Sequence, residues 1–354
     1  MTRIAISPDL QLRSDGSKQS FSARWTELAA ESGVEVVRAD ARNPDVLDKI
    51  EGCDGFMWRF AFYPASRLLA RRVLFAVEHG LGIPVFPSFR TAWHFEDKVA
   101  QHYLLRAADI PTPRTWVLNR REQALAFCQT AAYPLVLKLA AGIQSANVRL
   151  VPDAAEAARW IDQLFGPGLT SLATPPPSGK ASRALRRVST AAAALHGRRA
   201  AAADWQDELQ REHVYFQEFL EGNAFDTRVT VIGDRAFAFR RMNRPGDFRA
   251  SGSGRIDWNP AEIDLEMVRL AFRVARRLGT QSVAIDGLRR GDECVVGEIS
   301  YTYKSEAVRE CPGHWVLRGE PESGRLDWIE GQMAAEDAIF HDFLALVRSR
   351  AGVA

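Results

Sequence analysis

The stretch Ser282–Tyr301, SVAIDGLRRGDECVVGEISY, decides how the second half of the chain folds. Two short apolar strands surround a charged turn, which is the pattern of a β-hairpin. Each strand carries one carboxylate among residues that the pattern places in a core, Asp286 in VAIDGL and Glu298 in VVGEIS. If residues 291–293 form a three-residue loop, the two acids lie opposite each other with their side chains on one face.

Two facing carboxylates destabilise a sheet unless something neutralises their charge. Either one of them is protonated, or a cation lies between them. Hard divalent cations such as Mg²⁺ are held by a few carboxylates together with substrate phosphates. Ser300 points to the same face as Glu298 and is a third candidate ligand. The plainer alternative is that Asp286 starts the turn and Glu298 pairs with an arginine, and the hairpin alone leaves both open.

The composition excludes several classes of partner. The 354 residues include 46 Lys and Arg against 44 Asp and Glu, a net charge of +2, so the whole molecule does not attract nucleic acid or an anionic membrane. The four cysteines form no CxxC pair, which is typical of reduced thiols. No run of 18 apolar residues and no signal-peptide pattern occurs. We expect a soluble cytoplasmic protein without nucleic-acid or membrane partners.

Three units follow one another along the chain. In residues 1–92, short apolar strands alternate with amphipathic helices, which predicts a small parallel, Rossmann-like sheet, but without the GxGxxG of dinucleotide sites. Residues 93–206 form a second unit and residues 207–354 a third, which ends in an amphipathic helix. A basic, low-complexity insertion at about 166–206 predicts a flexible segment or partly helical lid. The alternative is a docking arm for a polyanion or an acidic protein.

Basic residues lie where a strand or helix would normally bury apolar ones. Lys138 stands inside PLVLKLA, and Lys98 begins the FEDKVAQHYLL helix. A half-buried lysine favours an anion, although each could extend its ammonium group into water. Several arginines cluster between residues 226 and 254, where they either bind phosphate or carboxylate oxygens or form a solvated face. Together with the facing carboxylates, these cations predict a nucleoside triphosphate bound with Mg²⁺.

The order of these parts resembles the ATP-grasp superfamily of carboxylate–amine ligases, in particular the branch of ribosomal-S6 glutamate ligase and glutathione synthetase. The resemblance covers about residues 1–305 and rests on the ordered set QEFLEGNAFDTRVTVIGD, FRRM, DFRASGSG, AIDGL and GEIS. It implies a mixed α/β ATP-grasp fold behind an N-terminal Rossmann-like domain. WHFEDKVAQHYLL, NRPGDFRASGSG, EISY and CPGHW are similar to uncharacterised RimK-like proteins of bacteria, which implies no known substrate.

The resemblance also implies roles for individual residues. The residues that would hold ATP phosphates, adenine (through the backbone of a hinge) and ribose are, in chain order, Lys98, Lys138, Ser145, Gln217, Glu218, Phe219, Leu220 and Asp226. The implied catalytic residues, near the γ-phosphate and the acceptor carboxylate, are Arg228, Arg241 and Arg249. The implied metal ligands are Asp286, Glu298 and Ser300. On the substrate side we expect Arg59, Arg90, Ser251 and Gly252, the two arginines because they follow predicted strand ends.

Two positions depart from the family pattern. Ser300 stands where the third metal ligand is usually Asn, and a hydroxyl is the weaker ligand. The phosphate loop, LAAGIQSAN, has a single glycine where the family is glycine-rich.

The resemblance implies an ATP- and Mg²⁺-dependent ligase that joins a carboxylate to an amine through an acylphosphate. The metal would be one or two Mg²⁺ ions, for which Mn²⁺ can substitute, and the substrates an amino acid, peptide or sugar acid. A non-catalytic ATP-binding sensor or scaffold is the competing hypothesis, and a homodimer is an open alternative.

Overall fold

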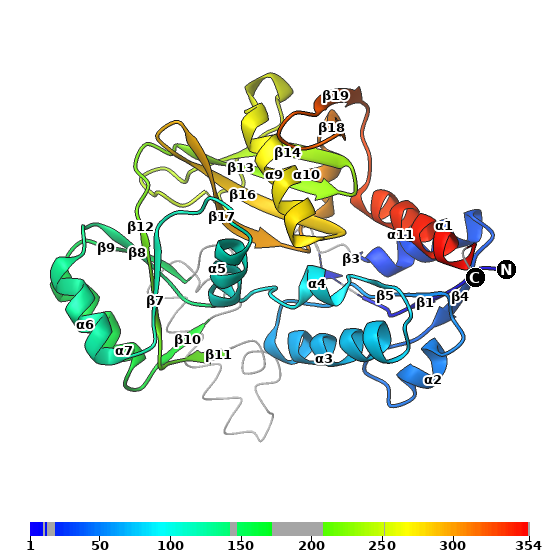
Figure 1. The fold of residues 1–354 in the computed structure, drawn as a ribbon, viewed down its shortest axis with the longest axis horizontal. Helices are drawn as coiled ribbons and strands as arrows, with labels where there is room; N and C mark the ends of the chain where they lie inside the picture. Colours follow the sequence, from blue (N-terminus) through cyan, green and yellow to red (C-terminus); the bar gives the residue numbers. More distant parts are fainter. Residues whose placement is uncertain (10, 13–17, 142–146, 172–207, 251, 353–354) are drawn as a thin grey trace.

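The structure, a computed structural model, describes residues 1–9, 11–12, 18–141, 147–171, 208–250 and 252–352. Three sheets of four or more strands make up most of the molecule (Figure 1). Ser145, Ser251 and most of the basic insertion lie outside the described residues. No helix within the described ranges has the length and apolar content needed to cross a membrane.

The N-terminal layer is a parallel sheet with the order β4-β1-β5-β6. Its strands are β1 (Arg3–Ile6), β4 (Glu35–Arg38), β5 (Gly55–Met57) and β6 (Val85–Phe86), and its helices are α1 (Phe21–Glu31), α2 (Val46–Ile50), α3 (Pro64–Phe75) and α4 (Phe89–Ala92). Neighbouring residues of β1 point to opposite faces, so Ile4 packs with Trp25 of α1, whereas Ala5 packs with Leu74 of α3. The small parallel sheet predicted from the alternating strands and helices is therefore observed.

The C-terminal helix α11 (Ala335–Ala351) returns to the N-terminal layer and lies beside α1 (Figure 1). The indole nitrogen of Trp25 donates to the carbonyl oxygen of Glu336 at 3.1 Å. Phe343 belongs to the same apolar cluster as Trp25. Sequence order groups this helix with residues 207–354, but its contacts place it on the first layer.

The second sheet is antiparallel, with the order β7-β12-β8-β9. Its elements are β7 (Thr115–Leu118), β8 (Leu135–Lys138), β9 (Val148–Val151), β12 (Val214–Glu218), and the helices α5 (Lys98–Ala107), α6 (Arg121–Thr130) and α7 (Ala154–Leu164). Helices α6 and α7 share an apolar core with one face of this sheet. Because β12 lies between β7 and β8, the chain leaves this sheet only after Glu218, later than the boundary predicted between residues 206 and 207.

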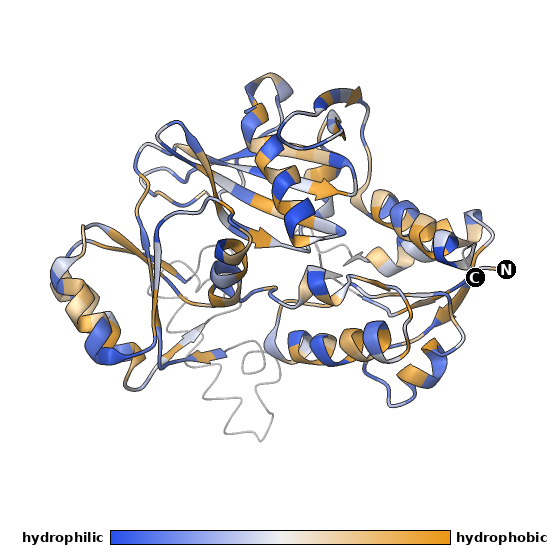
Figure 2. Ribbon diagram, viewed as in Figure 1, coloured by the Kyte–Doolittle hydropathy of each residue, from blue (hydrophilic) through white to orange (hydrophobic). Residues whose placement is uncertain are grey.

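The third sheet has the order β17-β16-β13-β14-β18-β19, with β15 paired to β14. Its elements are β13 (Phe225–Ile232), β14 (Arg235–Met242), β15 (Ile256–Asp257), α9 (Leu265–Leu278), β16 (Ser282–Arg290), β17 (Glu293–Ser300), β18 (Gly313–Arg318) and β19 (Arg325–Glu330). Helix α9 begins at the N-cap Asp264 and ends at Gly279, which adopts φ +63° as a left-handed C-cap. Its apolar side packs on one face of the sheet, and its polar side is visible in Figure 2.

The remaining elements are short. They are the strands β2 (Gln11–Leu12), β3 (Lys18–Gln19), β10 (Leu169–Ser171) and β11 (Glu208–Gln210), the π-helix η1 (Ala76–Gly80), the 3-10 helix η2 (Pro260–Glu262) and the helix α10 (Ser305–Arg309).

The packing of α11 generates a prediction about stability. Replacing Phe343, which is 3% exposed, by alanine leaves a cavity beneath the helix and should cost about 3–5 kcal/mol of unfolding free energy. Leu346→Ala is the matched control, because this neighbour on the same helix is 37% exposed and should cost less than about 1 kcal/mol. Denaturant unfolding measures both changes, and equal small losses would show that α11 does not pack on the N-terminal layer.

Candidate functional site

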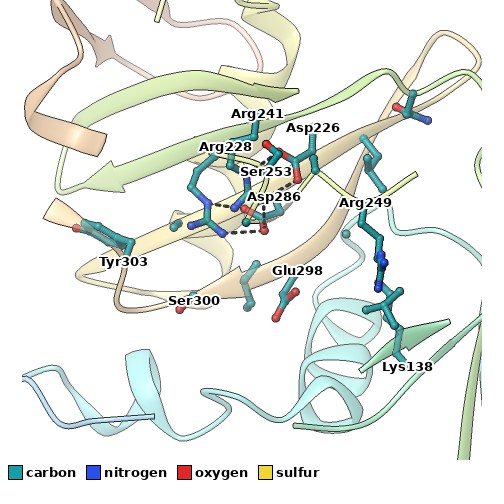
Figure 3. A pocket seen from close by; sticks show the side chains of 18 of the residues that line it. Lys138, Asp226, Arg228, Arg241, Arg249, Ser253, Asp286, Glu298, Ser300 and Tyr303 are labelled. Atoms are coloured by element: carbon teal, nitrogen blue, oxygen red, sulfur yellow. Dashed lines mark hydrogen bonds and ion pairs between the residues drawn. The ribbon is translucent and has the colours of Figure 1, made fainter. Parts of the chain in front are cut away.

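A cavity of about 480 Å³ lies between the second and third sheets. Its floor is one face of the third sheet, where alternate residues of neighbouring strands point the same way (Figure 3). These residues are Glu298 and Ser300 on β17, Ala284, Asp286 and Leu288 on β16, Asp226, Arg228 and Thr230 on β13, and Phe239 and Arg241 on β14. Intervening residues such as Val229 and Ile285 pack with α9 on the other face. The alternation therefore puts the charged groups on the cavity side and the core beneath them.

The β16–β17 hairpin sets the position of the two acids. Its loop contains two residues, 291–292, rather than the three predicted. A β-bulge leaves Gly297 without an opposite residue on β16, and this extra residue restores the register that the shorter loop would otherwise shift. Asp286 consequently lies opposite Glu298. The predicted pairing is confirmed, although the loop length from which it was derived is wrong.

Two arginines hold Asp286. Arg228 donates from Nε and Nη2 to its two oxygens at 2.6 and 2.8 Å, and Arg241 Nη2 lies 2.7 Å from Oδ2. Arg241 also donates to both oxygens of Asp226, at 2.7 and 2.6 Å. The four side chains form a connected set of ion pairs with alternating charge on the cavity floor (Figure 3).

The two arginines lower the pKa of Asp286. Burial alone would raise the pKa of Asp286, but Arg228 and Arg241 hold it far below its usual range. Burial likewise opposes the charge of Arg241, yet Asp286 and Asp226 raise the pKa of that guanidinium. Asp286 is therefore ionised near neutral pH. Protonation of Asp286 does not relieve the repulsion between the two acids, and the nearby cations do.

Glu298 has a counter-ion from another part of the chain. The Nζ atom of Lys98, the first residue of α5, lies 3.1 Å from Glu298 Oε1. Burial alone would lower the pKa of Lys98, but the carboxylates of Glu298 and Glu96 raise it above its usual value. The sequence suggested an arginine as the partner of Glu298. In the structure the partner is a lysine.

Lys138 lies at the end of β8 and lines the same cavity. Burial lowers its pKa to about 8, and neighbouring Lys98 contributes to the decrease, while Glu298 opposes it. Lys138 forms no ion pair with any residue in the described ranges. A buried amine of this kind is stabilised in its charged form by an anion that a ligand supplies.

The hinge residues 217–220 lie where the chain passes from the second sheet to the third, and all of them line the cavity. The carboxylate of Glu218 accepts from Arg114 Nε at 2.6 Å and from Arg290 Nη1 at 3.1 Å. The amide of Gln217 is also bonded inside the second sheet. These side chains therefore hold the hinge in place, and the hinge backbone is what remains to contact a ligand.

The loop after β14 brings Arg249 and Gly252 to the cavity wall. Arg249 Nε lies 2.9 Å from an oxygen of Asp247, whose carboxylate raises the pKa of Arg249. Arg149, on β9 of the other sheet, is exposed, and partial desolvation together with the positive charge of Arg249 lowers its pKa. Arg149 did not stand out in the sequence, because an arginine in a short strand reads equally well as a surface residue.

The two arginines predicted on the N-terminal layer have different positions. Arg59 is buried and lines the cavity, where its Nε donates to Thr302 Oγ1 at 2.7 Å. Arg90 is exposed on α4 and lies against Gly279. It is not among the described residues that line the cavity, so the structure does not bring it to the site. The turn into α4 directs it elsewhere, and strand-end position alone did not reveal this.

The residues that follow Ser300 were missed. Tyr301 stacks on Phe60 of the N-terminal layer with ring centroids 4.7 Å apart, and its hydroxyl donates to the Phe60 carbonyl oxygen at 2.7 Å. Thr302 and Tyr303 line the cavity. The signal was available, because the alternation of β17 places residue 302 on the side of residues 298 and 300.

The donor set allows a test of the predicted metal. Within the described ranges, no group of three or more His, Cys, Asp or Glu side chains is placed to hold a metal ion. Glu298 and Ser300 offer oxygen atoms on one face, and Ser300 Oγ donates its hydrogen to the Thr302 carbonyl at 2.7 Å, which leaves its lone pairs available. These groups fit a hard cation such as Mg²⁺ that takes its other ligands from phosphates and water. Asp286, by contrast, is already bonded to two arginines.

Comparisons with known proteins agree with this architecture. Residues 197–310 match the family model of the RimK-like ATP-grasp domain. The alpha-aminoadipate–LysW ligase LysX of Saccharolobus solfataricus is 24% identical over 213 residues, which are 60% of this chain and 62% of that relative. The chain thus matches less than two thirds of the relative's length.

Two solved structures share the fold over nearly the whole chain. A RimK-domain ATP-grasp protein from Sphaerobacter thermophilus has a TM-score of 0.52 at 19% identity, covering 97% of this chain and 100% of that one. The ATP-grasp ligase PsnB, complexed with a minimal precursor, Mg and ADP, has a TM-score of 0.53 at 18% identity, covering 98% of each chain. The chain therefore has the ATP-grasp fold, and its residues 197–310 are similar to the RimK-like ATP-grasp domain.

Proposed function

We propose that this chain is an ATP-dependent ligase that joins a carboxylate to an amine through an acylphosphate intermediate. The observation that carries the proposal is the cavity between two sheets, in which Lys98, Lys138 and Glu298 converge from separate elements. The two lysines can bind the oxygens of a polyphosphate, and the carboxylate of Glu298 can bind a divalent ion that accompanies it. LysX and PsnB support the same class, since both are named as ligases and PsnB is complexed with Mg and ADP.

The nucleotide would lie along the cavity from the hinge to the cavity floor. The backbone of residues 217–220 contacts the adenine, and Lys98 and Lys138 bind the phosphates. Asp226 is the candidate for the ribose hydroxyls, through the lone pairs that Arg241 leaves unused. Ser145, which lies outside the described residues, is proposed as a further contact to the phosphates.

Glu298 and Ser300 would hold the metal ion, for which Mn²⁺ can substitute. When bound, Mg²⁺ supplies charge neutralisation on the phosphate oxygens. The chain's own residues then position the nucleotide, and the arginines stabilise the negative charge of the transferring phosphoryl group.

In the proposed reaction, an oxygen of the acceptor carboxylate attacks the γ-phosphorus of ATP, and the bond to the β-phosphate oxygen breaks to release ADP. The amine then attacks the carbonyl carbon of the acylphosphate, phosphate leaves, and the nitrogen loses a proton. Arg228 and Arg249 line the cavity and would bind the γ-phosphoryl oxygens and the acceptor carboxylate. Arg241 acts mainly by holding Asp286 and Asp226 in position.

The substrate side would be formed by the N-terminal layer and the loop after β14. Arg59, Gly252 and, next to it in the chain, Ser251 are its candidate residues, whereas Arg90 is not among the described residues that line the cavity. A small-molecule or peptide carboxylate fits the proposal. LysX is named for α-aminoadipate and LysW, and PsnB is complexed with a precursor peptide.

Removing the charge of Glu298 tests the proposal. In Glu298→Gln, ADP production should fall by at least about 100-fold, because the metal ion would lose the carboxylate proposed to hold it. ADP release is measured with panels of carboxylic acids and amines, including α-aminoadipate and short peptides. Glu330→Gln, at the exposed end of β19, is the matched control and should leave the rate unchanged.

Circular dichroism checks that both variants remain folded. Equal rates in Glu298→Gln and in the unmodified protein would contradict the role of Glu298. Tight ATP binding without turnover on any pair of substrates would instead favour a non-catalytic sensor.

Lys138 generates a prediction about pH. With a pKa of about 8, it is half protonated in the free protein at pH 8, and bound phosphate should raise that pKa. Binding of a non-hydrolysable ATP analogue at pH 8 should therefore take up about half a proton per site, and almost none at pH 6. The affinity should fall as the pH rises through 8. Calorimetry in buffers of different ionisation enthalpy measures the uptake.

Lys138→Arg is the matched control, because a guanidinium stays charged over this whole range and should take up no proton at either pH. Binding of the analogue to the unmodified protein at pH 8 without proton uptake would contradict the assignment of Lys138 to the phosphates.

A further inference from the structure

We propose that Arg228 occupies the position of a second divalent cation, so that this chain binds its nucleotide with one metal ion, at Glu298, rather than two. The inference rests on the proposed function and concerns the same site. Two facing carboxylates could in principle hold two ions about 4 Å apart. The contacts of each carboxylate show that only one of them is open to a metal.

Glu298, Asp286 and Arg228 lie next to one another on three adjacent strands. Asp286 pairs with Glu298 of β17 on one side and with Arg228 of β13 on the other. Adjacent strands are about 4.8 Å apart, so the three side chains form one row on the cavity floor (Figure 3). The guanidinium is thus next to Asp286 and within the same row as Glu298.

Arginine N–H groups already use most of the lone pairs of the Asp286 carboxylate. A carboxylate has about four lone-pair sites. Three N–H groups already use them, two from Arg228 at 2.6 and 2.8 Å and one from Arg241 at 2.7 Å. A Mg²⁺ ion needs an oxygen at about 2.0–2.1 Å in an octahedral arrangement, and here it would also approach two positive groups. Asp286 is therefore a poor metal ligand in this chain.

These arginines cannot easily be displaced. Arg241 is anchored by both oxygens of Asp226, which is 9% exposed, and its removal would leave that carboxylate buried without its partner. Arg228 has Asp286 as its ion-pair partner among the described residues. A metal on Asp286 would have to use the one lone-pair site that these contacts leave, beside two guanidinium groups, or break the bidentate contact with Arg228.

Glu298 is more exposed than Asp286 and has fewer contacts. Its side chain is 33% exposed, against 14% for Asp286, and only its Oε1 atom pairs with Lys98. Its Oε2 atom accepts no hydrogen bond from any residue that the structure describes. Ser300, two residues further on, offers a hydroxyl oxygen on the same face. One ion can therefore bind here without displacing a protein contact.

Arg228 keeps one nitrogen atom available for a ligand. Its Nε and Nη2 atoms are bonded to Asp286, whereas Nη1 has no bond to a residue in the described part of the chain. The side chain is 21% exposed and lines the cavity. Arg228 can consequently link Asp286 to a phosphate oxygen, the arrangement of carboxylate, cation and phosphate that a metal ion would otherwise make.

Counting bound Mn²⁺ tests the inference. The full chain is saturated with the non-hydrolysable analogue adenylyl imidodiphosphate and titrated with Mn²⁺, and electron paramagnetic resonance measures the bound ions. The unmodified protein should bind one Mn²⁺ per nucleotide, without the spin coupling of two ions about 4 Å apart. Arg228→Met removes two of the three contacts to Asp286 and its adjacent positive charge, and should raise the count to two, with coupling. Arg228→Lys keeps the charge and should hold the count at one.

Two further variants keep the test decisive. Arg240→Met, which removes an arginine bonded to Asp257 outside the cavity lining, is the matched control and should bind one ion. Asp286→Asn should also bind one, because Asp286 is not a ligand, whereas a two-ion site would lose an ion.

Two coupled ions in the unmodified protein, or one ion in nucleotide-bound Arg228→Met, would overturn the inference and leave the ligase proposal standing. Failure of the unmodified protein to bind the nucleotide would overturn both.

Discussion

Two carboxylates face each other across adjacent strands of one sheet, and the rest of the site is arranged around their repulsion. Asp286 and Glu298 cannot both remain ionised on one face without nearby positive charge. The chain supplies this charge from different elements. Arg228 and Arg241 come from the neighbouring strands, while Lys98 comes from helix α5, which packs against β17. The electrostatic balance of the floor therefore depends on the approach of α5 to the third sheet, and the cavity is formed where that approach occurs.

The strand that carries Glu298 also connects the cavity to the N-terminal layer. Beyond Ser300, Tyr301 enters the core of that layer, and the backbone and side chains of the next two residues hold Arg59. A change in the position of either layer would thus be transmitted to the end of β17. The C-terminal helix strengthens the connection, because α11 returns to pack beside α1. The substrate side and the phosphate side of the cavity are in this way parts of one packed unit.

Much of this could be predicted from the sequence, since strand alternation and glycine turns are local signals. The hairpins, the parallel N-terminal sheet and the pairing of Asp286 with Glu298 all follow from period-two patterns. The bulge at Gly297 could not be predicted, and the correct register resulted from two errors that cancelled.

Long-range partners were beyond local signals. The sequence suggested a cation near Glu298 but could not identify Lys98, which is two hundred positions earlier in the chain. It also could not show that Asp286 is bonded to two arginines. Arg59 and Arg90 looked equivalent as residues after strand ends, and only the packing of α4 separates them. The placement of α11 depends in the same way on a surface that its own sequence does not describe.

A nucleotide bound between the second and third sheets is the central requirement of the proposed function. A crystal structure with a non-hydrolysable ATP analogue and Mg²⁺ tests this claim most directly. We expect the adenine beside the backbone of residues 217–220 and the terminal phosphate between Lys98, Lys138 and Glu298. A nucleotide bound at the edge of the N-terminal sheet, with the cavity filled only by water, would contradict the account.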